Sequence, residues 1–274
     1  MKYQFFILLT VVAGLIFIGC ATETADVIQP TAIENIHFLP ANIMLGTANI
    51  MLGNLDGRVP AEPMDDVASD QVLLKQTNPG IAPIQSSPHG KTYSAWPADW
   101  WDWALGSPAS VHPLLDATGV NCGVNQSGQV WFLGGRLFGS GPIIRECTVP
   151  AGQSLFFPLI NTFIGAFLDD PPAQRTEAFL RAAVDCVKDA EFPLVEIDGV
   201  AVDNPKQYLE ESVLFDLFLP AEGLFGELTL SPSVDKGFYL FLNPLTPGAH
   251  TIKWQASSAD CGFGQDITYN LTVE

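Results

Sequence analysis

The sequence predicts a mainly β protein, a β-sandwich of jelly-roll or immunoglobulin-like type with two or three short helical insertions. Short aromatic and β-branched runs bounded by Gly, Pro or Asn recur along the second half of the chain. Asp198-Gly199 separates two such runs, as expected for a two-residue hairpin turn. Polar and apolar residues alternate in the last two runs, which predicts strands with one wet face.

The chain begins with the features of a lipoprotein signal peptide over residues 1–20. Lys2 supplies a positive start, and an apolar run from Phe5 to Ile18 ends in Gly19-Cys20. The run is shorter than the roughly twenty residues that span a bilayer. A small residue before cysteine suits lipoprotein processing, so we expect diacylglycerol on Cys20 and anchorage by two or three acyl chains. An ordinary signal peptide or an uncleaved anchor remains the alternative.

Residues 21–90 are rich in proline and contain a tandem repeat of Ala-Asn-Ile-Met-Leu-Gly within 41–54. Two copies are too few for a solenoid, which needs at least three units to bury a core. We therefore expect a flexible tether, followed by one globular domain over residues 91–274.

The globular domain opens with a helix signal. Pro97 and Asp99 suit the first turn of a helix, and Gly106 with Pro108 ends it. A second helix is expected at 174–188, where apolar residues form a stripe, and a third after Asn204-Pro205. The expected strands are 129–133, 154–160, 194–197, 213–218, 238–242, 250–254 and 266–273.

The chain is strongly acidic, with 30 acidic and 12 basic residues and a formal charge of −18. Such a surface repels phosphate backbones, so nucleic acid is not an expected partner. No Gly-rich phosphate loop or His/Cys ligand cluster is evident, and neither a cofactor nor a metal is expected. Asp169-Asp170 offers calcium ligands, but Pro171-Pro172 directly after it makes a helix start the simpler interpretation.

Four cysteines remain after Cys20: Cys122, Cys147, Cys186 and Cys261. An even number in an exported chain indicates two disulfides. Three connectivities are open, and proximity in sequence favours Cys122–Cys147 with Cys186–Cys261.

An ordered series of short motifs resembles a family of uncharacterised exported bacterial proteins. The motifs are Trp100-Trp101-x-Trp103, Asn121-Cys122, Gln126-Ser127-Gly128-x-Val130-Trp131-Phe132-Leu133, Cys147-Thr148-Val149-Pro150-Ala151-Gly152, Phe156-Phe157-Pro158, Pro247-Gly248-x-His250-Thr251-Ile252 and Gln265 to Val273. The resemblance covers roughly residues 93–274. It implies an exported protein and supplies no activity.

Two groups of residues are candidates for a site. For ligand binding we expect Trp100, Trp101, Asn121, Gln126 and Arg136. Packing in the core explains Trp96, Trp100 and Trp103 without a ligand, because they share one helix face, whereas Trp101 lies off that face and is expected to be free. Asn121 and Gln126 also suit a turn.

The alternative is catalysis by His112, Asp116 and Asp102, with His112 and Asp116 as an acid–base pair. No Gly-x-Ser-x-Gly elbow supports Ser127 or Ser154 as a nucleophile. The sequence thus predicts a lipid-anchored protein outside the cytoplasm, at the outer membrane or the outer face of the cell membrane, that binds a polysaccharide, another envelope component or a protein. A secreted hydrolase or lyase is the alternative. A closed pocket joining Asp102, His112, Asp116 and Arg136 would favour catalysis, and exposed coplanar Trp rings would favour binding.

Overall fold

The computed structural model describes residues 80–274. The expected signal peptide, the lipidation site at Cys20 and the tandem repeat lie outside the described residues. The folded body begins earlier than the expected boundary at residue 91, because Ile81 and Ala82 are buried. The Ala82 amide donates to the Phe241 carbonyl at 2.8 Å. That boundary was therefore placed too late.

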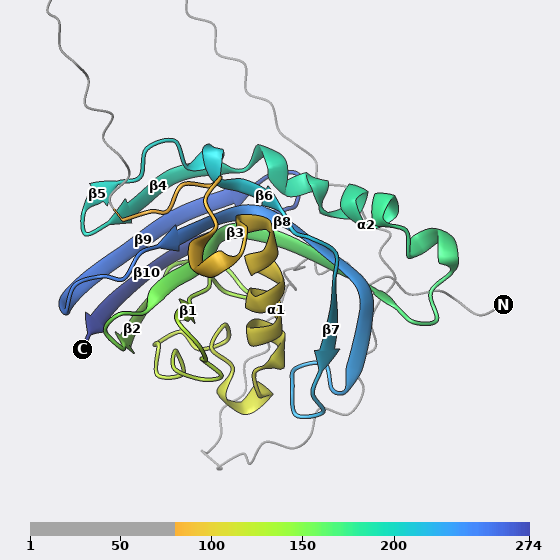
Figure 1. The fold of residues 1–274 in the computed structure, drawn as a ribbon, viewed down its shortest axis with the longest axis horizontal. Helices are drawn as coiled ribbons and strands as arrows, with labels where there is room; N and C mark the ends of the chain where they lie inside the picture. Colours follow the sequence, from red (N-terminus) through yellow and green to blue (C-terminus); the bar gives the residue numbers. More distant parts are fainter. Residues whose placement is uncertain (1–79) are drawn as a thin grey trace, which may run out of the picture. The chain divides into compact units, whose positions relative to one another are not determined.

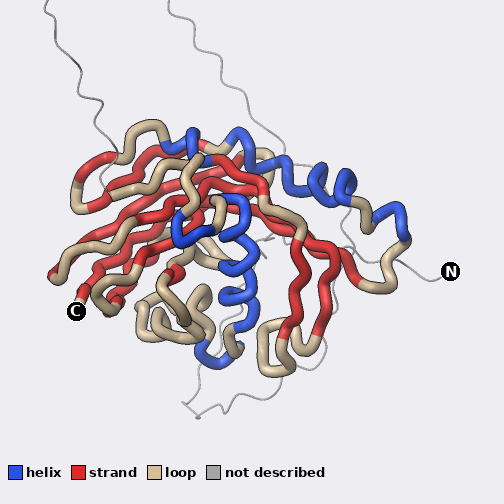
Figure 2. The backbone as a smooth tube through the Cα atoms, viewed as in Figure 1, coloured by secondary structure: helices blue, strands red, loops and turns tan. Residues whose placement is uncertain are grey.

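The described residues are mainly β, as expected, and form two five-stranded sheets (Figures 1 and 2). Sheet 1 has the order β1 (Val130–Phe132), β3 (Ser154–Phe167), β8 (Leu228–Leu242), β6 (Leu209–Glu211), and β7 (Phe215–Leu219) also pairs with β8. Sheet 2 has the order β2 (Ile143–Val149), β10 (Phe263–Val273), β9 (Gly248–Ser258), β4 (Glu191–Ile197), β5 (Val200–Ala201). Strand pairs are antiparallel except β1 with β3 and β2 with β10.

The two sheets share one hydrophobic core. Side chains alternate along β8, so Phe238, Leu240 and Leu242 enter this inter-sheet core. The intervening Tyr239 and Phe241 belong to a second cluster on the opposite face of sheet 1. Both faces of sheet 1 are therefore buried, which fits the uninterrupted apolar run of this strand.

The second cluster is closed by α1 (Trp96–Gly106), which Figure 1 shows beneath the arch of β3 and β8. Pro97 lies in its first turn with Asp99, and the helix ends where Ser107 turns extended before Pro108. The Ser107 hydroxyl donates to the Trp103 carbonyl at 2.8 Å. The predicted start and end of this helix are confirmed.

The expected helix at 174–188 is broken into three pieces. A 3₁₀ turn at Pro172–Gln174 precedes α2 (Glu177–Val184), and a 3₁₀ segment follows at Asp185–Asp189. Thr176 caps α2 by accepting from the Phe179 amide at 3.3 Å. After Asn204, a 3₁₀ turn at Pro205–Tyr208 takes the place of the third expected helix.

Each of the seven expected strands is present, with shifted ends. Asp198 and Gly199 form the predicted hairpin turn between β4 and β5, with φ values of 52° and 74°. β2 was not predicted, because Arg145 occupies an inward position in it and interrupts the apolar alternation.

Both predicted disulfides are confirmed. Cys122–Cys147 and Cys186–Cys261 have Cα–Cα distances of 5.9 Å and 5.2 Å. The first ties the loop before β1 to β2, and the second ties the segment after α2 to the turn between β9 and β10.

Candidate functional site

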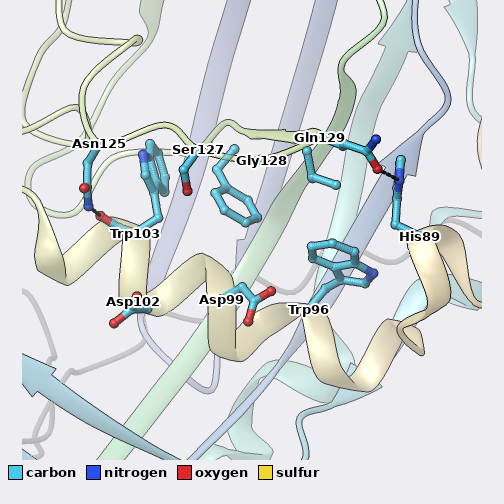
Figure 3. A pocket seen from close by; sticks show the side chains of 11 residues that line it. His89, Trp96, Asp99, Asp102, Trp103, Asn125, Ser127, Gly128 and Gln129 are labelled. Atoms are coloured by element: carbon cyan, nitrogen blue, oxygen red, sulfur yellow. Dashed lines mark hydrogen bonds between the residues drawn. The ribbon is translucent and has the colours of Figure 1, made fainter.

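A pocket of about 490 Å³ opens beside α1, and we call it the α1 pocket (Figure 3). It lies between the helix, the loop 125–129 and β1, with a 3₁₀ turn (Pro88–Gly90) at one end. Its lining residues are apolar Trp96, Trp103, Val130 and Phe132 and polar His89, Asp99, Asp102, Asn125, Ser127 and Gln129, with Gly128. An apolar wall thus faces polar groups that can orient a ligand.

The helix supplies an aromatic wall and two carboxylates from one side. Trp96, Asp99 and Trp103 are three and seven positions apart, so the 3.6-residue period places them on one face. Asp102 lies three positions after Asp99 and adds a second carboxylate to the same pocket.

The two carboxylates have different partners. Asp99 pairs with the Lys91 ammonium, which also lies 5.1 Å from the centroid of the Trp96 ring. Asp102 has no hydrogen bond or ion pair within the described residues. Although Asp102 as a residue is exposed, partial burial raises the pKa of its carboxyl, and the charge of Asp99 raises it further. The charge of Asp99 is therefore balanced by Lys91, whereas the described residues supply no counter-charge for Asp102.

The side chain of Gln126 makes three hydrogen bonds that hold the loop opposite the helix. Its amide donates to the carbonyls of Cys122 at 3.0 Å and Phe132 at 2.8 Å, and its oxygen accepts from the Phe132 amide at 2.9 Å. The Trp103 indole donates to the Val124 carbonyl at 2.9 Å. The pocket wall is therefore fixed both to β1 and to the helix.

His89 closes the other end of the pocket in a left-handed backbone conformation, with φ 51°. Its Nδ1 lies 3.1 Å from Gln129 Oε1, and its Nε2 lies 3.0 Å from Ser154 Oγ. This atom order resembles that of a Ser–His relay, with an amide in place of the acid. Ser154 is only 2% exposed and does not line the pocket. The contacts therefore fasten the turn at Pro88–Gly90 to the edge of sheet 1.

The structure contradicts the expected aromatic platform, because all four tryptophans of α1 are buried. Trp101, expected to be free, is 6% exposed and donates from Nε1 to Asp235 Oδ2 at 2.7 Å. Trp100 donates to the Leu133 carbonyl at 2.7 Å. Phe163 of β3 and Asp235 of β8 contact the Trp101 ring, so the position off the shared face is covered by sheet 1 too.

The expected catalytic group is not assembled. His112 is 2% exposed, and its Nδ1 accepts from the Leu114 amide at 3.2 Å. Burial lowers the pKa of His112, partly offset by the Ala104 carbonyl. Within residues 80–274, no side-chain hydrogen bond or ion pair joins any two of His112, Asp116 and Asp102. Of the three, only Asp102 lines the α1 pocket.

Asp116 instead organises a turn, since its two carboxylate oxygens accept from Thr118 and from the Asn121 amide. Burial raises the pKa of Asp116, but these hydrogen bonds outweigh it, and the net pKa is lowered. Neither Asn121, Gln126 nor Arg136 lines the α1 pocket. Arg136 exchanges backbone hydrogen bonds with the Gln265 side chain, at 2.8 Å and 3.0 Å.

A buried carboxylate that the sequence reasoning missed lies behind the helix. Asp235 of β8 has no exposed surface and accepts hydrogen bonds from Trp101, from Asn161 at 3.1 Å and from Tyr239 at 2.5 Å. Burial raises the pKa of Asp235 to about 7, against the lowering effect of these donors. It connects the helix to sheet 1 and has no opening to the α1 pocket.

Arg145 is a second buried charge that was missed. Its guanidinium donates to the carbonyls of Asp116, Gly134 and Gly135 at 2.7 Å, 2.6 Å and 2.9 Å. It also donates to the Tyr269 hydroxyl at 2.8 Å. These contacts hold the loop between α1 and β2 against sheet 2, so Arg145 is a structural residue.

No metal site is evident in residues 80–274, where no three His, Cys, Asp or Glu side chains converge. The Asp170 carboxylate accepts from the Phe167 amide at 2.8 Å, just before a 3₁₀ turn that begins at Pro172. Within the same residues, no helix is both long enough and apolar enough to cross a membrane. Neither a scan of known protein-family models nor a search of curated proteins finds a match.

Proposed function

We propose that this chain is an exported lipoprotein, anchored through Cys20, whose β-sandwich domain of jelly-roll or immunoglobulin-like type binds a carbohydrate or another envelope component in the α1 pocket. The observation that carries the proposal is the pocket itself, because a hollow of about 490 Å³ combines an aromatic wall with polar side chains. The two disulfides support a location outside the reducing cytoplasm.

The lining of the pocket fits a polyhydroxylated ligand. Trp96, Trp103 and Phe132 line the pocket, and the small part of each that is exposed, at most 7%, offers apolar contact to the C–H groups of a ring. Asn125 and Gln129 carry amides that both donate and accept, as hydroxyl groups require. α1, β1 and the loop that Gln126 ties to β1 hold these groups in place, so little conformational entropy is lost on binding.

The experiment is a binding screen of the mature chain against soluble glycans and cell-envelope fragments, by calorimetry. Ser127→Trp fills the pocket, whereas Ser110→Trp puts the same ring on an exposed turn outside it. We expect a ligand whose binding is lost in the first variant and kept in the second. Ligands that bind both variants equally would place recognition elsewhere and overturn the proposal.

The lipid anchor has its own test. Mass spectrometry of the N-terminal peptide of the membrane-purified protein is expected to show acyl chains on Cys20. A Cys20→Ala variant should leave the membrane fraction. Retention of that variant on the membrane would reject lipidation as the anchor.

A hydrolase or lyase is the second candidate, and one observation favours it. Asp99 forms an ion pair with Lys91, whereas Asp102 has no such partner within the described residues and the pKa of its carboxyl is raised by partial burial, so two neighbouring carboxylates lie in different environments, as acid and base roles require. Chromogenic glycosides and uronides are suitable substrates for an assay. If Asp102→Ala removes turnover and Asp216→Ala, on an exposed stretch of β7, does not, the enzyme reading stands. Absence of turnover on any substrate that binds the pocket rejects it.

A further inference from the structure

The α1 pocket carries negative charge that residues 80–274 do not balance. Among these described residues, the charged side chains that line the pocket are Asp99 and Asp102, and none is Lys or Arg. Lys91 neutralises Asp99 from the margin, so the charge of Asp102 is left over. A neutral sugar would leave this carboxylate without a counter-charge.

The margin of the pocket already shows how an ammonium group is held there. Lys91 Nζ contacts the Asp99 carboxylate and lies over the Trp96 ring, 5.1 Å from the centroid. A carboxylate beside an aromatic face attracts an ammonium both as an ion pair and through the ring quadrupole. Asp102 stands one helical turn further along and also lines the pocket, with no ammonium supplied by the described residues.

We infer that the α1 pocket takes a sugar bearing a free amine, whose ammonium pairs with Asp102 while its ring lies against the aromatic wall. The inference rests on the proposed binding function and narrows its ligand class. The neutral amides and hydroxyl of Asn125, Ser127 and Gln129 lie across from the helix, where they can reach ring hydroxyls (Figure 3). A basic peptide would need further carboxylates along its path, and residues 80–274 place only these two in the pocket.

The test uses three oligosaccharides of equal length and linkage: the glucosamine tetramer, its fully N-acetylated form and cellotetraose. Titration calorimetry of the mature chain, at a pH where the amines are protonated, compares the affinities of three ligands that differ in charge but have nearly the same shape. We expect at least about tenfold tighter binding of the amine, equivalent to ~1.4 kcal/mol. Equal affinity for the amine and acetylated forms would overturn the inference and leave the binding function intact.

Two matched variants distinguish a specific ion pair at Asp102 from non-specific attraction of an amine to an acidic protein. Asp102→Asn and Asp216→Asn remove the same charge, but only the first lies in the pocket. We expect the preference for the amine to fall to less than threefold in Asp102→Asn and to persist in Asp216→Asn. Equal losses in both variants would show bulk electrostatics and reject a site at Asp102.

A gain of affinity sharpens the test. Lys91→Met removes the ammonium that occupies Asp99, so a ligand amine then meets two unpaired carboxylates. We expect severalfold tighter binding of the glucosamine tetramer and unchanged binding of cellotetraose. If Lys91→Met leaves amine binding unchanged, the ammonium does not sit at this pair. If no tetramer binds but Ser127→Trp still blocks another ligand, the ligand class is wrong and the pocket function survives.

Discussion

The two faces of sheet 1 are buried by different means. The face toward sheet 2 is apolar and closed, with Trp254 fully buried between Phe157 and Tyr269. The face toward α1 is aromatic but includes the buried carboxylate of Asp235, and it borders the α1 pocket. The face toward sheet 2 therefore contributes to stability alone. The face toward α1 contributes to stability and also borders the pocket in which we propose that a ligand binds.

The difference follows from how each face is covered. Side chains of the two sheets interdigitate in one shared core. A single helix of eleven residues and long loops cannot cover the other face as evenly. Indole N–H groups have partners on both faces, as Trp101 and Trp254 show, but on the helix face a hollow remains beside Asp102.

The largest effect is expected from the disulfides, both of which pack in the inter-sheet core, although Cys122–Cys147 also anchors the loop at the α1 pocket. Loop entropy predicts that losing Cys186–Cys261, which spans 75 residues, costs about 4.5 kcal/mol, and losing Cys122–Cys147, which spans 25, about 3.5 kcal/mol. Serine double variants in urea unfolding measure both. Only loss of Cys122–Cys147 should alter ligand binding, because this disulfide anchors the loop of the α1 pocket. Altered ligand binding in the Cys186–Cys261 variant would contradict the claim that only Cys122–Cys147 supports the pocket.

Replacing one tryptophan on each face tests the contrast in packing. Trp254→Ala leaves a closed cavity and breaks its hydrogen bond to Leu159 at 3.0 Å, so we expect a loss of about 4 kcal/mol in the free energy of unfolding. Trp96→Ala opens into the α1 pocket, where water can enter, and should cost about 2–3 kcal/mol. Equal losses, or a larger one for Trp96→Ala, would show that the helix face is packed as tightly as the inter-sheet core.

The elements of the inter-sheet core could be predicted from sequence, because alternation and turn residues act locally. Asp198-Gly199 and the runs of β9 and β10 are examples. β2 escaped prediction because Arg145 is buried there by distant carbonyls that no local pattern reveals.

The α1 pocket could be predicted only in part. Asp102 was expected as a site residue, and the spacing of Trp96, Asp99 and Trp103 indicated one helix face. His89 and Gln129 come from segments far apart in the chain, and their meeting depends on the pairing of β1 with β3. Trp101 was misplaced because a helical wheel assumes one buried face, whereas Phe163 of β3 and Asp235 of β8 also cover the Trp101 ring.

Asp235 makes the helix face sensitive to pH in a defined direction. Its pKa is raised from 3.8 to about 7 by burial, so the folded state holds the proton more tightly than the unfolded state. The resulting stability is full below pH 3.8 and is lost as pH rises through about 7. Relative to the native chain, Asp235→Asn should therefore become more stable between pH 4 and pH 8, by on the order of 4 kcal/mol.

The measurement is urea unfolding of both proteins across that pH range. Asparagine can keep the contacts to Trp101 and Tyr239 through its oxygen and its amide, so the packing is preserved. Exposed Asp216→Asn is the control and should show no such trend. A difference between Asp235→Asn and the native chain that does not vary with pH would mean that Asp235 is ionised in the fold throughout.

The smallest effect is expected at Gln126, where hydrogen exchange of single amides can compare the two faces of sheet 1. Gln126→Ala removes three hydrogen bonds at a partly buried site and should cost about 1–2 kcal/mol. Its consequence is local, because the side chain joins only the pocket loop and β1. Amide hydrogen exchange should accelerate at Phe132 and stay unchanged at Leu240 in the inter-sheet core. Gln126→Glu keeps the acceptor for the Phe132 amide and should protect it partly. Faster exchange at both amides would mean that the two faces of sheet 1 open together. The faces would then differ in the side chains that they bury and not in local stability.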